Sequence, residues 1–246
     1  MKIRSSFLLM IMLFVLQAGL HAQEIVNVVL VGQEGVTEDI KKATSFIVVK
    51  QYPANIYERL DYNMGKPLIK LRTYSDSLLK SQEGAQLEYY PSGSLQVKGN
   101  FSKNLKEDDW LYFNDTGKHI LTETYKAGEL IASKQPDTTT KKDSVVYGDE
   151  REANIKGGVK SWIKYIQKNL NADVAQSSVK GGHVRVLFKI NTEGKTTEIY
   201  LKKSVEFVLD EEALRVIRDS PLWIPAFQNG RALNAYRIQP VTFVKE

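Results

Sequence analysis

Few side chains of this chain could do chemistry, and they are scattered. Nucleophilic and metal catalysis rely on histidine or cysteine. The chain has no cysteine and three histidines, of which only His119 and His183 lie beyond the first 22 residues. Neither has ligand-type residues around it at metal-binding spacing. His183 falls on the polar side of an alternating segment, which favours a solvated residue over a ligand. We therefore expect no catalytic residue, no metal, no cofactor and no enzyme activity.

Two other features could imitate a functional site. The acidic run Asp210-Glu211-Glu212 could act as paired carboxylates in acid and base catalysis. It also precedes an apolar helical pattern, and Asp210 as an N-cap with an acidic first turn is the favoured interpretation. Trp223 stands between two prolines, where a core anchor is favoured over a stacking platform for a ligand.

The elements around these residues predict a small domain over residues 157–246. Apolar residues at helical spacing predict a first helix, with lysines on its other side: Val159, Trp162, Ile163, Ile166 and Leu170. Residues 182–190 alternate, and a glycine turn joins them to a second alternating strand ending near residue 201, which predicts a hairpin. A second helix follows from Asp210, and a final strand runs from about Leu233 to Val244. Helix, hairpin, helix and strand predict an α+β domain.

Several linked motifs in this segment stand in a characteristic order: Gly182-His183-Val184-Arg185-Val186-Leu187-Phe188 with Gly194, Leu209-Asp210-Glu211-Glu212-Ala213, Pro221-Leu222-Trp223-Ile224-Pro225 with Asn229-Gly230, and Pro240-Val241-Thr242-Phe243. In order and spacing they resemble the C-terminal domain of TonB. The resemblance implies a binding protein that captures a segment of an outer-membrane TonB-dependent transporter, or of another envelope protein, by pairing it with the last strand of the sheet.

The resemblance implies a partner-binding edge in the last strand: Tyr236, Arg237, Ile238, Gln239, Val241, Thr242 and Phe243. Pro240 fits an edge strand, because proline in a central strand would break the hydrogen-bonding ladder. We expect the function to be peptide capture in the periplasm, linked to TonB-dependent transport. A homodimer through the C-terminal domain is a further expectation.

Residues 23–130 predict a second, mostly antiparallel β domain. The β-branched segments 25–31 and 46–49 predict strands. Within residues 83–130 a 24-residue spacing relates Tyr89 to Phe113 and Gly93 to Gly117, which predicts an array of β-hairpins. These units resemble divergent MORN-type repeats. Their aromatic residues either form an ordinary core or line a groove for a partner. The second choice gives a competing function, a cell-envelope scaffold whose hairpins bind the partner without energy transduction.

The remaining segments suggest export and a connection between the two domains. Residues 1–22 have a basic start, an apolar run and a small-residue end, which predicts a cleaved signal peptide and a periplasmic location. The alternative is an uncleaved inner-membrane anchor, although the apolar run is shorter than the roughly 20 residues that span a bilayer. Residues 131–156 are polar and predict a flexible linker. The net charge is +5. We expect no nucleic-acid partner, because an exported chain has no access to one and no basic-aromatic stripe is present.

Overall fold

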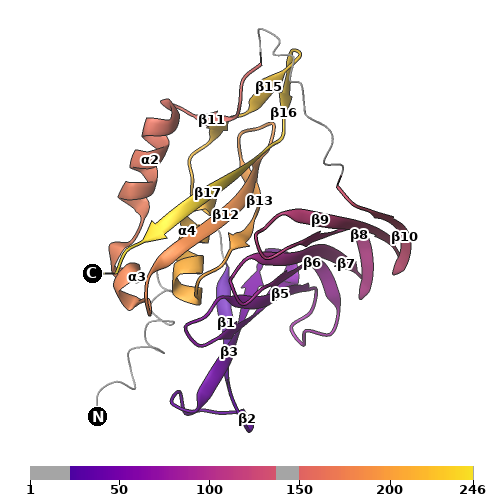
Figure 1. Cartoon of the computed structure of the whole chain (residues 1–246), viewed down its shortest axis with the longest axis vertical. Coiled ribbons are helices and arrows are strands. Elements are labelled where there is room, and N and C mark those ends of the chain that lie inside the picture. Colours follow the sequence, from indigo (N-terminus) through magenta and orange to yellow (C-terminus); the bar gives the residue numbers. More distant parts are fainter. Residues whose placement is uncertain (1–22, 137–149, 246) are drawn as a thin grey trace.

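The larger part of the protein is one ten-stranded antiparallel sheet, seen in indigo to magenta in Figure 1. The structure is a computed structural model that describes residues 23–136 and 150–245. The strands follow chain order except that β1 lies between β2 and β3. They are β1 (Glu24–Gly32), β2 (Gly35–Val36), β3 (Ala43–Tyr52), β4 (Ile56–Asn63), β5 (Leu68–Tyr74), β6 (Gln82–Tyr89), β7 (Leu95–Ser102), β8 (Leu105–Phe113), β9 (His119–Lys126) and β10 (Glu129–Lys134), with a short 3-10 helix, η2 (Pro53–Asn55), before β4.

The 24-residue repeat is a repeat of hairpin turns. The N–H of Gly93 donates to the carbonyl of Tyr90, and the N–H of Gly117 donates to the carbonyl of Asn114, both at 2.8 Å. The two glycines have φ of 88° and 82°, a left-handed conformation that residues with a side chain adopt at a cost. The prediction of a hairpin array is confirmed.

Several aromatic residues of the repeat are packed in the interior of the protein. Tyr89 and Phe113 are buried in the core. Trp110 is also buried, and the rings of Phe101 and Tyr125 contact it edge to face, at centroid distances of 5.2 and 6.2 Å. These contacts agree with the ordinary-core interpretation of the aromatic pattern.

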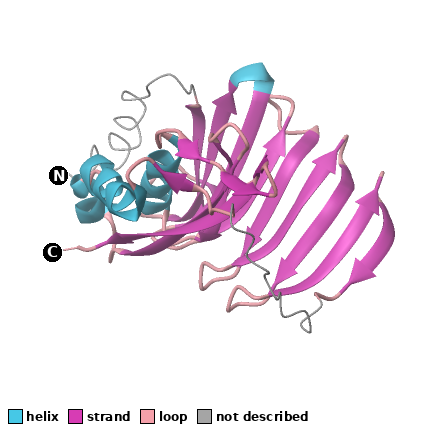
Figure 2. Cartoon of the chain, turned by 90° about the horizontal axis from the view of Figure 1, so that it is seen from above, coloured by secondary structure: helices cyan, strands magenta, loops and turns pink. Residues whose placement is uncertain are grey.

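The C-terminal region is a small α+β domain, as the sequence predicts. Its main sheet has the order β13-β12-β17, and both α2 and α4 cover one face of it (Figure 1). Figure 2 shows these helices gathered at one end of the molecule, opposite the last strands of the large sheet. The elements are β11 (Asn154–Ile155), α2 (Gly158–Asn169), α3 (Ala172–Ser177), β12 (Gly182–Ile190), β13 (Thr196–Lys203), α4 (Phe207–Arg218), β14 (Trp223–Ile224), β15 (Ala226–Gln228), β16 (Arg231–Leu233) and β17 (Ala235–Phe243).

Helix α2 forms where the sequence predicts it, but its apolar face is narrower than predicted. Trp162 is buried, and its ring contacts Trp223 and Phe188 at centroid distances of 4.8 and 6.5 Å. Val159 and Ile163, which the pattern also assigned to the buried face, are 63% and 49% exposed. The helix is turned so that Trp162, with Tyr165 and Ile166, faces the core, and Val159 and Ile163 lie to one side of this contact.

The two regions share one hydrophobic core. The ring of Phe207 in α4 packs edge to face against Phe46 and Tyr62 of the large sheet, at 5.8 and 5.5 Å. The hydroxyl of Tyr89 donates to the carbonyl of Leu201 in β13 at 3.0 Å. The large sheet therefore completes its packing against the C-terminal region.

The ends of the predicted linker belong to folded elements. Residues 131–134 belong to β10, which pairs with β9, and β11 near the other end of the linker pairs with β14. The middle of the linker, residues 137–149, lies outside the described residues, as does the predicted signal peptide of residues 1–22.

Candidate functional site

The strand that the sequence marks for partner binding is β17, which forms one edge of the C-terminal sheet. β17 pairs with β12 along its whole length. Within the described residues no strand pairs with its other edge. At the opposite edge of this sheet the N-terminal region meets only the end of β13, where Ser94 forms a β-bridge with Lys203 and the N–H of Ser204 donates to the carbonyl of Gly93 at 2.9 Å. The edge of β17 is therefore open along its whole length in the described residues.

The predicted partner-binding residues divide between two faces of the sheet, because side chains alternate along a strand. Tyr236, Ile238 and Thr242 lie on the exposed face, where Tyr236 and Ile238 are 58% and 43% exposed. Val241 and Phe243 are buried on the face that α2 and α4 cover. A partner strand could reach the exposed side chains and the backbone of the edge, whereas the buried pair holds β17 in its own domain.

The side chains of Arg237 and Gln239 point to the helical face, and both form hydrogen bonds with other residues of this chain. The guanidinium of Arg237 donates to the carbonyl of Ala153. The indole N–H of Trp162 in α2 donates to the side-chain oxygen of Gln239 at 2.6 Å. The amide of Gln239 also donates to the carbonyl of Pro240 at 2.7 Å. These two predicted residues anchor β17 to the segment before α2 and to α2 itself.

The exposed face beside β17 is organised around one carboxylate. Glu198 in β13 accepts hydrogen bonds from the hydroxyl of Tyr236, at 2.9 Å, and from the ammonium of Lys189 in β12. The bond to Glu198 raises the pKa of Lys189. His183 is exposed, with Nδ1 lying 2.9 Å from the hydroxyl of Thr242. This face therefore carries a hydrogen-bonded network of polar side chains beside the exposed Ile238.

The predicted role of Asp210 as an N-cap is wrong. Helix α4 begins at Phe207 with Glu206 as its N-cap residue, so Asp210 lies one turn inside and is fully buried. It accepts hydrogen bonds from the hydroxyls of Ser204 and Tyr62, the latter at 3.1 Å. The N–H of Val205 donates to its second oxygen at 2.9 Å. Burial raises the pKa of Asp210 to about 7, even though these bonds favour the charged form.

A second buried acid joins the two regions through an ion pair. The Nζ atom of Lys50 in β3 lies 2.5 Å from Glu211, and the two side chains are 2% and 9% exposed. The other carboxylate oxygen of Glu211 has no hydrogen-bond partner within the described residues. Such a pair is costly to form and costlier to break, because removing one partner leaves an uncompensated buried charge.

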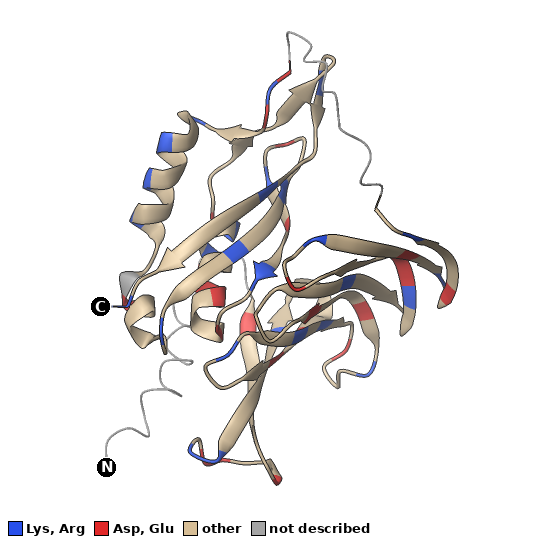
Figure 3. Ribbon diagram, viewed as in Figure 1, with Lys and Arg blue, Asp and Glu red and all other residues tan. Residues whose placement is uncertain are grey.

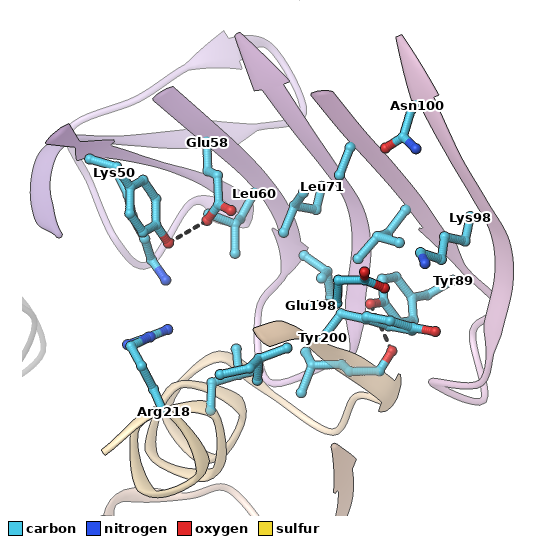
Figure 4. Close-up of a pocket in the computed structure, with 17 residues that line it drawn as sticks. Lys50, Glu58, Leu60, Leu71, Tyr89, Lys98, Asn100, Glu198, Tyr200 and Arg218 are labelled. Atoms are coloured by element: carbon cyan, nitrogen blue, oxygen red, sulfur yellow. Dashed lines mark hydrogen bonds between the residues drawn. The ribbon is translucent and has the colours of Figure 1, made fainter. Parts of the chain in front are cut away.

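A cavity of about 400 Å³ lies between the large sheet and the C-terminal domain (Figure 4). Its walls are largely apolar, with Leu60, Leu87 and Leu214 among them. Lys98 stands in the wall with its ammonium 4.7 Å over the ring of Tyr200, and burial lowers its pKa. Charges of both signs line the cavity, and they point to no single class of ligand.

The remaining candidates for a functional site are a metal site, His119 and Trp223. No three His, Cys, Asp or Glu side chains in residues 23–136 and 150–245 converge to hold a metal ion. The Nε2 atom of His119 lies 2.9 Å from both the carbonyl of Leu121 and the hydroxyl of Thr122. Trp223 is buried against Trp162 and Phe188, which confirms it as a core anchor. The expected absence of enzyme activity stays a prediction.

Residues 173–244 match the family described as Gram-negative bacterial TonB protein C-terminal. The matched segment runs from α3 to just beyond β17, so it contains the hairpin, α4 and the open edge, while α2 and the large sheet lie outside it. No curated protein and no solved structure matches the chain. In the part of the chain that the structure describes, no helix is both long and apolar enough to cross a membrane.

Proposed function

We propose that this chain is a periplasmic TonB-like binding protein that captures an extended segment of an outer-membrane transporter, or of another envelope protein, by strand addition to β17. The observation that supports this proposal is the open edge of β17 within the segment that matches the TonB C-terminal family. An unpaired edge offers a row of backbone donors and acceptors to another chain. No catalytic step, cofactor or metal enters the proposal.

The backbone and the exposed side chains of β17 suggest how a captured strand would be held. Backbone groups of alternate residues point to the same edge of a strand, so Ile238 and Pro240 share an edge. Proline is tolerated where its missing N–H faces away from a neighbouring strand, which assigns both residues to the open edge. The N–H of Ile238 is then available to a partner, and the exposed rings and chains of Tyr236 and Ile238 offer contacts to alternate side chains.

Ile238→Pro in the full chain tests strand addition. The variant removes a backbone donor from the open edge and leaves the pairing with β12 intact. We expect it to weaken binding of a synthetic transporter plug peptide at least tenfold, measured by titration calorimetry. Ile238→Thr is the matched control, because it keeps the N–H and the β-branched shape. Equal affinity of the proline variant and the wild type, with both folded by circular dichroism, would refute the mechanism.

A scaffold function is the second candidate, and one observation favours it. The last strands of the large sheet extend beyond the C-terminal domain (Figure 2), and they expose Ile120, Leu130 and Ile131. We propose that these hairpins are divergent MORN-type repeats. In the same titration, a loss of binding in Ile131→Asp but not in Ile238→Pro would favour the scaffold over strand addition.

The location is part of the proposal. Residues 1–22 would act as a cleaved signal peptide, and the alternative is that they anchor the chain in the inner membrane. Sequencing the N-terminus of the mature protein separates the two, since cleavage leaves a chain that begins near Gln23. A homodimer through the C-terminal domain would compete with a partner for β17, and light scattering would detect it.

A further inference from the structure

The outer side of α2 has an unusual charge distribution. Lys160, Lys164 and Lys168 are all exposed and recur every four residues, so they form a row about 12 Å long. The helix contains no Asp or Glu, and Figure 3 shows blue segments along α2 with no red among them. Within the described residues these lysines make no ion pair and no side-chain hydrogen bond. The row therefore presents three uncompensated charges.

Two aliphatic side chains lie next to this row. At about 100° per residue, Val159 and Ile163 fall between the lysines and the buried side of the helix that holds Trp162. They are 63% and 49% exposed, although the sequence pattern would bury them. Exposed aliphatic groups along one flank of a lysine row are the arrangement of helices that lie in a membrane interface, where the lysines meet phosphates and the aliphatic groups enter the acyl boundary.

The position of α2 leaves this side accessible. The helix lies on the side of the C-terminal domain that faces away from the large sheet (Figure 1). Its inner side is held by Trp162, which contacts Phe188 and Trp223 and donates to Gln239 of β17. A ligand bound to the outer side of α2 would thus contact a helix that is hydrogen-bonded to β17.

We propose that α2 docks the protein on an anionic phospholipid membrane through Lys160, Lys164, Lys168, Val159 and Ile163. The charge complementarity is with lipid phosphates, and each lysine near such a surface adds attraction that salt screens. Docking would hold β17 beside the membrane, where segments of membrane proteins emerge. The inference is independent of strand addition, because lipid binding and peptide binding are measured separately.

Vesicle co-sedimentation with the full chain tests the proposal. The vesicles contain phosphatidylglycerol and phosphatidylcholine in one set and phosphatidylcholine alone in the other. We expect binding to the first set only, decreasing as salt rises. The triple change Lys160→Gln, Lys164→Gln and Lys168→Gln should weaken binding on the order of 100-fold. Val159→Asn with Ile163→Asn should weaken it several-fold at constant charge.

The matched control removes the same charge elsewhere. Lys42, Lys103 and Lys118 are exposed lysines in the turns between strands of the large sheet, and their combined replacement by glutamine should leave vesicle binding within about twofold of the wild type. Equal losses in the two triple variants would reduce the effect to net charge and overturn the proposal. Wild-type binding to both vesicle sets alike would overturn it too, as would binding to polyglutamate without binding to either set.

Discussion

At the scale of single residues, Asp210 joins the two regions of the protein. It is fully buried in α4, yet its hydrogen-bond donors come from Tyr62 of the large sheet and from Ser204 and Val205 after β13. Ser204 is itself tied to the large sheet, because the N–H of Leu68 donates to its hydroxyl at 2.7 Å. Loss of the proton from Asp210 would place a charge in this apolar contact, and burial opposes that loss.

Asp210 should make stability depend on pH. Its pKa is about 7 in the folded protein, against about 4 for an unfolded aspartate. Between these values the folded state binds more protons, so its contribution to the free energy of unfolding is complete below pH 4 and is lost as pH rises through 7. We expect that free energy to fall more steeply from pH 4.5 to 7.5 in the wild type than in Asp210→Asn, by a few kcal/mol at most.

Urea titrations at several pH values measure this difference. Asp173→Asn, which replaces an exposed aspartate of α3, is the control for the loss of one carboxylate. Parallel curves for the wild type and Asp210→Asn would mean that Asp210 does not titrate in this range.

At the scale of elements, the hairpin turns of the repeat provide a matched comparison. Gly93 and Gly117 occupy equivalent turns with nearly the same φ, but Gly93 lies much closer to the backbone of the C-terminal region. A Cβ atom at Gly93 would overlap the carbonyl oxygen of Ser204, whereas one at Gly117 would meet only the Cε atom of Lys202 at 3.9 Å. The two turns therefore share the same backbone constraint and differ in their surroundings.

Alanine at these two glycines should have unequal costs. Gly117→Ala adds the strain of a left-handed residue, about 1–2 kcal/mol. Gly93→Ala should cost a further 1–3 kcal/mol or so, because the chain at Ser204 must shift. Chemical denaturation of both variants measures the difference. Equal costs would mean that the turn can move away from β13 freely.

Local patterns in the sequence predict the elements of this fold well, because apolar residues recur with the period of a helix or of a strand within each element. The 24-residue repeat and the strands of the C-terminal sheet follow from spacing and turn residues. The edge position of β17 is implied by the resemblance to TonB, and Pro240 agrees with it. The start of α4 does not, since Asp210 has the residue type of a cap while tertiary burial decides its role. Val159 and Ile163 match a buried helical face, but the helix packs on the sheet through the side that holds Trp162 and leaves them exposed.

At the scale of the whole molecule, contacts between distant residues decide how the regions assemble. Lys50 and Glu211 are 161 positions apart, and each has an ordinary local context that gives no sign of the other. The shared core likewise depends on Phe46, Tyr62 and Phe207 meeting in space. For this reason the sequence suggests two domains joined by a linker, whereas the structure packs them as one unit.

The buried ion pair should link the stability of the two regions. Lys50→Met or Glu211→Leu alone leaves one buried charge and should cost about 3–5 kcal/mol. The double variant should recover most of that loss, because both charges are gone. A double-mutant cycle in urea measures the coupling. Additive losses would show that the pair contributes little, and separate unfolding transitions for the two regions in the wild type would contradict a common core.

The pairing of Lys50 with Glu211 also fixes an order of events during synthesis. Lys50 and Tyr62 are made before α4, so until α4 packs on the large sheet their polar groups have neither Glu211 nor Asp210 as a partner. A fragment that stops before Glu206 would expose the rings of Phe46 and Tyr62 as well. We therefore expect the newly made N-terminal region to complete its folding only when nearly the whole chain is available.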